Sequence, residues 1–169
     1  MTFSIIARCA CTGRLGMASA TFSIACGRRY ESVRPNVGIS KSQAFYLRGV
    51  DVLALNMLAA GHRPAHILRS LEASDPDFSF RQLGILDREG NVVAHTGQDT
   101  KPWSGQIVGP GYATYGNVLA GPATLAGIEA GRFASSAAVP WSRRCTHGSP
   151  PNSLVSPVVR PWRRQSDTR

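Results

Sequence analysis

The stretch that decides the fold is Met1-Thr2-Phe3-Ser4-Ile5-Ile6-Ala7-Arg8, at the beginning of the chain. Phe3, Ile5 and Ala7 alternate with their neighbours, and β-branched residues lie among them, which predicts a strand over residues 2–8. The same stretch places a small hydroxyl residue directly after Met1. If Met1 is removed, the hydroxyl and the free amino group of Thr2 can act as nucleophile and base without a separate base residue. An α-amino group has a pKa of about 8, so a useful fraction is neutral near physiological pH.

The composition of the chain is that of one globular domain. It has 169 residues, of which 43% are hydrophobic and 17% are charged, enough for a single sizeable core. No apolar run approaches the roughly 20 residues of a membrane-spanning helix, and the beginning lacks a signal-peptide pattern. We therefore expect a cytoplasmic protein without a membrane partner. The four cysteines lack zinc-site spacing, and we expect buried apolar side chains rather than metal ligands.

The last part of the sequence differs from the rest in charge and pattern. Residues 132–169 hold seven of the 19 basic residues but one of the ten acidic ones, and are rich in Pro, Ser and Arg. Such a segment cannot easily pack a core. We interpret residues 1–131 as the domain and residues 132–169 as a disordered basic tail or an out-of-frame translation product. A nucleic-acid-binding arm is the least favoured of these interpretations.

Within residues 1–131, the patterns alternate between period two and helical spacing, an α+β arrangement with an antiparallel sheet core. Pro64 lies between His62 and His66 at the start of one predicted helix, and we expect it to keep the two rings off a shared face. We found no phosphate-binding loop, nucleophile elbow or zinc-protease helix. The predicted strands cover residues 2–8, 15–25, 37–43, 80–87, 92–96 and 112–115, and the predicted helices cover 45–60, 64–73 and a segment beginning at 122.

An ordered set of five segments resembles one bacterial family, the domain of unknown function family 1028, which is grouped with the N-terminal nucleophile (Ntn) hydrolases. The resemblance covers about residues 1–131. No single segment is specific, but their order along the chain is. The segments are MTFSIIAR at 1–8, TGRLGMAS at 12–19, RQLGILD at 81–87, GNVVAHTG at 90–97 and GNVLAG at 116–121.

The resemblance implies a four-layer αββα sandwich of antiparallel sheets. It also implies acyl transfer, in which the Thr2 hydroxyl attacks an amide carbonyl after Met1 is removed and backbone N–H groups stabilise the oxyanion. The implied partner is a small-molecule or peptide amide, with no cofactor and no metal. Lys41 and Ser19 are the further catalytic candidates. The candidates for substrate binding are Thr21, Gln43, Gln82, His95 and Asn117.

One departure from the family pattern affects the end of the chain. Family members carry Gly-Gly-Asp and Arg-Gly-Gln-Ser segments in their C-terminal part, and residues 132–169 hold no counterpart. We therefore expect a sandwich truncated at its C-terminus, with exposed apolar surface that could promote a homo-oligomer. Two alternatives to the hydrolase stay open: a binding or structural domain without chemistry, and an inactive fragment of a frameshifted gene.

Overall fold

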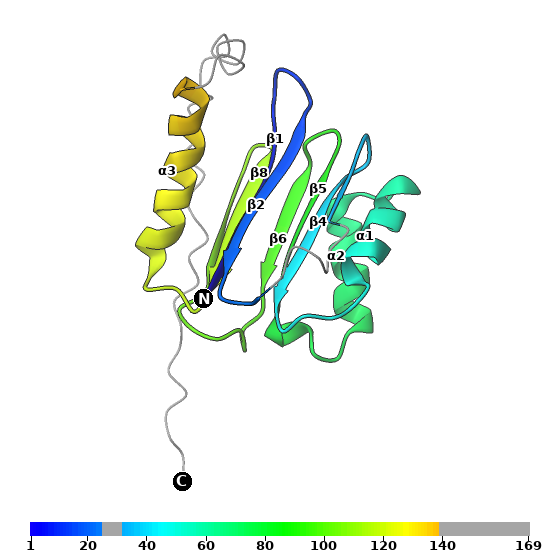
Figure 1. Ribbon diagram of the computed structural model, residues 1–169. Coiled ribbons are helices and arrows are strands. Elements are labelled where there is room, and N and C mark those ends of the chain that lie inside the picture. The colour runs from blue at the N-terminus through cyan, green and yellow to red at the C-terminus, as the bar shows by residue number, and fades with distance from the viewer. Residues whose placement is uncertain (25–31, 139–169) are drawn as a thin grey trace.

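The computed structural model describes residues 1–24 and 32–138, and the first predicted strand lies in the middle of one of its two sheets (Figure 1). This first sheet is antiparallel with the order β2-β1-β8-β7. Because β1 has a partner on each side, Thr2 lies at the end of an interior strand and not on a sheet edge. The strands are β1 (Thr2–Arg8), β2 (Leu15–Thr21), β7 (Gly105–Gly109) and β8 (Tyr112–Asn117).

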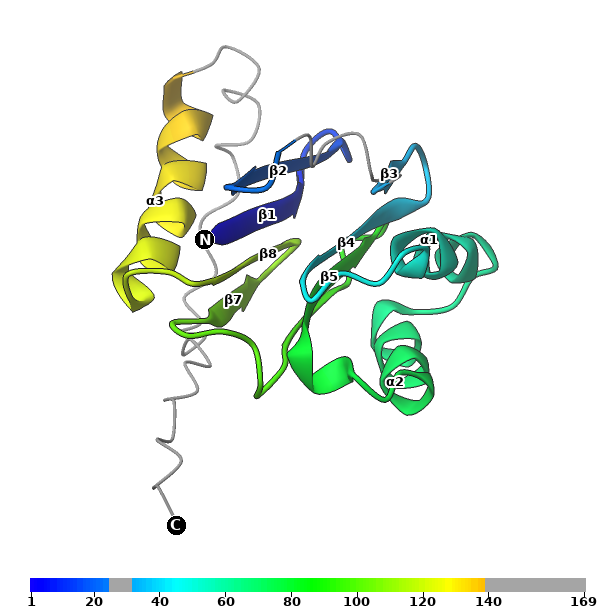
Figure 2. The same cartoon turned by 60° about the horizontal axis from the view of Figure 1, so that its bottom comes forward.

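The second sheet is also antiparallel, has the order β3-β4-β5-β6, and stacks on the first (Figure 2). Helices α1 and α2 lie on its outer side, while α3 runs along the outer side of the first sheet over β7 and β8. The α+β expectation is confirmed, with two antiparallel sheets and three α-helices in the described residues. The strands are β3 (Val33–Arg34), β4 (Gly38–Ala44), β5 (Arg81–Asp87) and β6 (Val92–Thr96).

The helices follow local sequence signals, with one correction. Helix α1 (Val50–Ala59) was predicted to begin at residue 45, but Gly49 precedes it in the left-handed region at φ 88° and delays its start. Helix α2 (Pro64–Ser74) begins with proline in its first turn, where the missing N–H costs nothing. A 3₁₀ turn (Phe78–Phe80) leads into β5, and α3 covers Pro122–Ala138. In the described residues, no helix has the length and apolar character needed to cross a membrane.

Two apolar clusters hold these layers together. One joins α1 and α2 to the outer side of the second sheet and contains Leu55, Ile67 and Ile85, all fully buried. The other lies between the two sheets. The sheets approach closely at Gly84, where a Cβ would lie only 2.6 Å from the Tyr115 ring. The inter-sheet cluster consists of Ile6, Ile39, Leu86, Ala113 and Tyr115.

Three strand predictions need correction. The second strand ends at Thr21 and not at residue 25, because the Thr21 hydroxyl accepts a hydrogen bond from the Ser23 N–H at 3.2 Å, a local turn that competes with the ladder. Val33 and Arg34 form β3 inside a predicted loop. Strand β7 was missed because glycines bound a run of only three residues, and its pairing with β8 stabilises it.

The predicted boundary after residue 131 falls inside α3, which continues to Ala138. Residues 139–169, which make up most of the predicted basic tail, lie outside the described residues. The expectation of buried cysteines is wrong for Cys11, which is exposed, and is not met by Cys9, which is half-buried. Cys26 and Cys145 lie outside the described residues.

Candidate functional site

Thr2 lies at one end of β1, on the face that is directed toward the second sheet. Side chains alternate along a strand, and Ile6, on the same face, belongs to the inter-sheet cluster. Thr2 pairs with Thr21 on one side and with Asn117 on the other. Its Oγ1 lies 2.9 Å from Oγ1 of Thr21, and the residue is half-buried. The predicted nucleophile and Thr21 are therefore in direct contact, and neither is sealed in the core.

A chain of hydrogen-bonded, buried polar side chains begins at Ser4, two residues after Thr2 on β1. The Ser4 hydroxyl donates to Oε1 of Gln43 at 2.6 Å, and Nε2 of Gln43 donates to Oε1 of Gln82 at 2.9 Å. Nδ2 of Asn117 donates to the same Gln82 oxygen at 2.8 Å, while Nε2 of Gln82 donates to the Gly116 carbonyl at 2.7 Å. Three predicted residues from two sheets thus meet in one hydrogen-bonded group, which compensates for their burial.

Ser4 on β1 connects this group to Ser19 on the neighbouring strand β2. Their hydroxyl oxygens lie 2.8 Å apart, and the Ser19 hydroxyl also donates to the Phe3 carbonyl at 3.3 Å. Ser19 therefore contacts Ser4, and its pair with Ser4 lies two residue pairs along the strands from the pair of Thr2 and Thr21. Ser4 was not predicted as a site residue, although the period of two from Thr2 placed it on the same face.

Lys41 is buried, with 3% of its surface exposed, on the same face of β4 as Ile39 and Gln43. That face is directed toward the first sheet because Ile39 belongs to the inter-sheet cluster. The Lys41 ammonium donates to the Ser42 carbonyl at 3.1 Å, and the Tyr115 hydroxyl donates to the Lys41 carbonyl at 2.6 Å. Lys41 therefore lies between the two sheets and not on the surface of the protein.

Asp51, in the first turn of α1, is the charged neighbour of Lys41 that the sequence analysis did not single out. Its carboxylate accepts from the Ser42 N–H at 2.8 Å and from the hydroxyls of Ser42 at 2.9 Å and Ser40 at 3.1 Å. Burial raises the pKa of Asp51, while the bonds from Ser42 and the Lys41 charge act against this rise. An aspartate in an otherwise apolar helical pattern was the signal that could have identified it.

His95 is the predicted residue that the fold does not bring to Thr2. It pairs with Leu83, whose side chain is in the cluster under the helices, so it lies on the outer side of the second sheet. Its ring stacks on Phe78 at 4.1 Å, and Nε2 donates to the Phe78 carbonyl at 3.2 Å. The adjacent Thr96 joins the site instead, because its hydroxyl accepts from Nε2 of Gln82 at 3.1 Å.

The expectation that Pro64 keeps the rings of His62 and His66 off a shared face is wrong. The rings of His62 and His66 stack with centroids 5.0 Å apart, since Pro64 begins the helix and lets the preceding turn bring His62 alongside. Both side chains are exposed. In residues 1–24 and 32–138, no three His, Cys, Asp or Glu side chains are grouped as a metal site requires.

The backbone at the Thr2 end of the sandwich adopts two uncommon conformations. Ala44 follows Gln43 with φ 69°, and Val118 follows Asn117 with φ 54°. Left-handed values are costly for residues with a Cβ, most of all for a β-branched one. The Val118 N–H donates to the Lys101 carbonyl at 3.2 Å, which helps to hold this conformation. Strain of this kind is concentrated at functional sites in proteins.

These features define an α+β protein of two stacked antiparallel sheets, with hydroxyls, amides and a buried lysine gathered between the sheets at one end. Residues 2–146 match the model of the family of unknown function DUF1028, and the chain belongs to this family. A crystal structure of a Silicibacter pomeroyi protein described with the same family model matches at TM-score 0.76 and 29% identity. The match covers 85% of this chain and 66% of that one. No curated protein matches the sequence.

Proposed function

We propose that this protein is an amidohydrolase of the N-terminal nucleophile type, with Thr2 as nucleophile after Met1 is removed. The observation that supports this most directly is the position of Thr2, half-buried at the end of β1 and facing the second sheet. A single residue there offers a hydroxyl and, once terminal, an amine, which is the minimal set for covalent acyl transfer.

The proposed reaction has two steps. The Thr2 hydroxyl oxygen forms a bond to the amide carbonyl carbon while the α-amino group takes the hydroxyl proton. The same proton then passes to the leaving amine as the C–N bond breaks, which leaves an ester on Thr2. In the second step the Thr2 α-amino group takes a proton from water and the water oxygen attacks the ester carbonyl carbon. The bond between that carbon and Thr2 Oγ1 then breaks, and the α-amino group returns the proton to Oγ1, which releases the carboxylic acid and restores the Thr2 hydroxyl.

A backbone donor beside Thr2 fits the role of stabilising the reacting carbonyl. The Phe22 N–H donates to the Met1 carbonyl at 3.3 Å, and that carbonyl belongs to the amide bond that precedes Thr2. Once Met1 is removed, this donor loses its acceptor directly beside the Thr2 amino group. We assign it to the substrate carbonyl, whose oxygen becomes negative in the transition state.

Lys41 supplies the positive charge in this proposal. A cation disfavours protonation of a nearby amine, so a buried ammonium between the sheets keeps more of the Thr2 amine in its basic form. Asp51 and the two serine hydroxyls bound to it hold β4 in place beside Lys41. The proposal also includes the four-layer sandwich of the Ntn superfamily, with α1 and α2 as one helical layer and α3 in the other.

The test compares the wild type with Thr2→Ala and with Thr12→Ala, which alters an exposed threonine in the turn after β1. Intact-mass measurement should find Met1 removed, and an acylating β-lactone should add one mass increment to the wild type and to Thr12→Ala but not to Thr2→Ala. Lys41→Met should be labelled more slowly at pH 7. A mature protein that retains Met1, or labelling that persists in Thr2→Ala, would refute the proposal.

A further inference from the structure

Exposed apolar side chains are concentrated at the end of the sandwich where Thr2 lies. Ten large hydrophobic side chains are exposed in the described part of the chain, and seven of them lie within three residues of a strand end at this end of the sandwich. Met1 would leave on processing. The other six, which we call the apolar rim, are Phe22, Ile24, Phe45, Leu47, Phe80 and Val118.

Part of the apolar rim comes from the first sheet. Phe22 is 81% exposed and follows β2, and its N–H contacts the residue that precedes Thr2. Val118 follows Asn117, which pairs with Thr2. Both residues are therefore next to the strand pairs that hold the proposed nucleophile.

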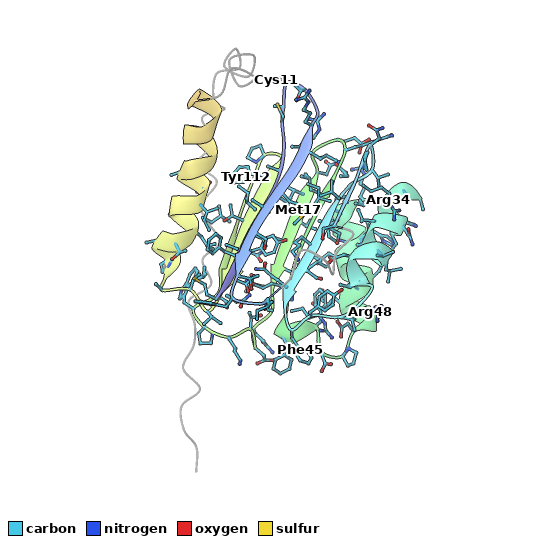
Figure 3. The ribbon with its side chains drawn as sticks, viewed as in Figure 1. Cys11, Met17, Arg34, Phe45, Arg48 and Tyr112 are labelled. Carbon is cyan, nitrogen blue, oxygen red and sulfur yellow. The ribbon has the colours of Figure 1, made fainter. Side chains whose placement is uncertain are left out.

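The rest of the apolar rim comes from the second sheet. Phe45 follows the end of β4, is 58% exposed, and meets the edge of the Phe80 ring at a centroid distance of 6.2 Å. The Arg81 guanidinium lies 5.2 Å from the centre of the Phe45 ring and also donates to the Phe45 carbonyl. Figure 3 shows Phe45 and Arg48 at the end of the ribbon opposite Cys11. Phe45 is thus held outward by contacts on its backbone and ring.

Single exposed hydrophobic residues are normal on a protein surface, but a group of them around polar residues marks a binding surface. The acyl part of an amide substrate remains on Thr2 through both proposed steps, whereas the amine leaves after the first. Apolar contacts to the acyl part therefore act in both transition states.

We propose that the apolar rim binds the acyl group, and that the substrates are amides of apolar acids. This inference rests on the hydrolase proposed above and adds the substrate class to it. Arg48 and Lys101 are exposed cations at the same end, so an acidic acyl group is the competitor that must be excluded.

The test measures kcat/KM for three 7-amido-4-methylcoumarin substrates with acetyl, hexanoyl and succinyl groups. The hexanoyl amide should be cleaved at least about tenfold faster than the acetyl amide, since four additional methylene groups are partly buried. Phe22→Ser and Phe45→Ser should each reduce this ratio severalfold. The matched control is Leu53→Ser, which removes a 49% exposed leucine from α1 and should leave the ratio unchanged.

Each other result counts against one specific claim. Equal rates for acetyl and hexanoyl amides, preference for succinyl, or rim variants that match Leu53→Ser would overturn the acyl assignment while leaving the hydrolase intact. No Thr2-dependent cleavage or labelling at all would overturn the hydrolase itself. If neutral phosphatidylcholine vesicles bind the wild type but not Phe22→Ser, and the acyl ratio does not change, the rim is a lipid contact and the inference is wrong.

Discussion

The two halves of the space between the sheets differ in what fills them. Toward the end of β1 that carries Arg8, the sheets meet through Ile6, Ile39 and Leu86, which are fully buried and apolar. Toward the end that carries Thr2, the same strands bury Gln43 and Gln82. Burying an amide is costly unless each polar atom is hydrogen-bonded. A fold that needed only stability would extend the apolar half, so the composition of the polar half indicates a function.

The largest expected effect is a loss of stability caused by a substitution in the apolar half. Ile6→Ala should lower the free energy of unfolding by about 4 kcal/mol, because it removes a fully buried side chain from a tightly packed cluster. Chemical denaturation would measure the loss. The fraction that stays folded should still be labelled at Thr2 at the wild-type rate. A slower rate in folded protein would show that the two halves are not separable.

The second effect concerns the ion pair that supports the second sheet near Phe45. Arg81 donates from Nη2 to Asp75 at 3.0 Å and also from Nε, and these hydrogen bonds hold the pKa of Asp75 below its usual range. Asp75→Asn should cost about 2 kcal/mol at pH 7. A lowered pKa contributes stability above the unfolded value of about 3.9 and loses it as pH falls through the folded pKa.

The difference in melting temperature between wild type and Asp75→Asn should therefore be greatest near neutral pH and shrink below about pH 4. Calorimetry between pH 3 and 7 provides the measurement. A difference that grows on acidification would mean that the carboxylate is not stabilised by Arg81 in the folded protein.

The third effect contrasts two buried polar groups. Gln82→Leu should cost about 2 kcal/mol, because Asn117 and the Gly116 carbonyl each lose a buried partner, and it should also slow Thr2 labelling. Thr114→Val is the control: the Thr114 hydroxyl is fully buried and has no hydrogen-bond partner in the described residues. This nearly isosteric change should be neutral or stabilise by up to about 1 kcal/mol. Equal losses in both variants would contradict the assigned network.

The smallest effect is a change in pH dependence at Asp51. Its pKa is raised by burial, so its contribution to stability is complete below about pH 3.9 and decreases as pH rises through the folded pKa. The melting-temperature advantage of the wild type over Asp51→Asn should therefore shrink by a few degrees between pH 4 and pH 7. An advantage that widens over this range would indicate that Lys41 and the serine hydroxyls outweigh burial.

Local patterns predicted the parts of the fold that depend on neighbours in sequence. The hairpin of β5 and β6 and the start of α2 at Pro64 were located from turn residues and proline alone. The start of α1 was predicted too early, at residue 45, because Leu47 fits the helical spacing of the residues that follow. Gly49 adopts a left-handed conformation, so the helix begins only after it. Strand β7 was missed because its pairing with β8, and not its composition, makes it a strand.

The sequence by itself predicted that Thr2 begins a strand, that residues 37–43 form another strand, and that the chain is α+β. These follow from the period of two along strands and the helical spacing between them, which need no knowledge of distant residues. Only the tertiary structure decided that Ser4, Gln43 and Gln82 join in one hydrogen-bonded chain and that His95 lies on the outer side. The physical reason is that the stacking of the sheets sets which strand faces meet, and burial then requires the polar groups on those faces to find partners.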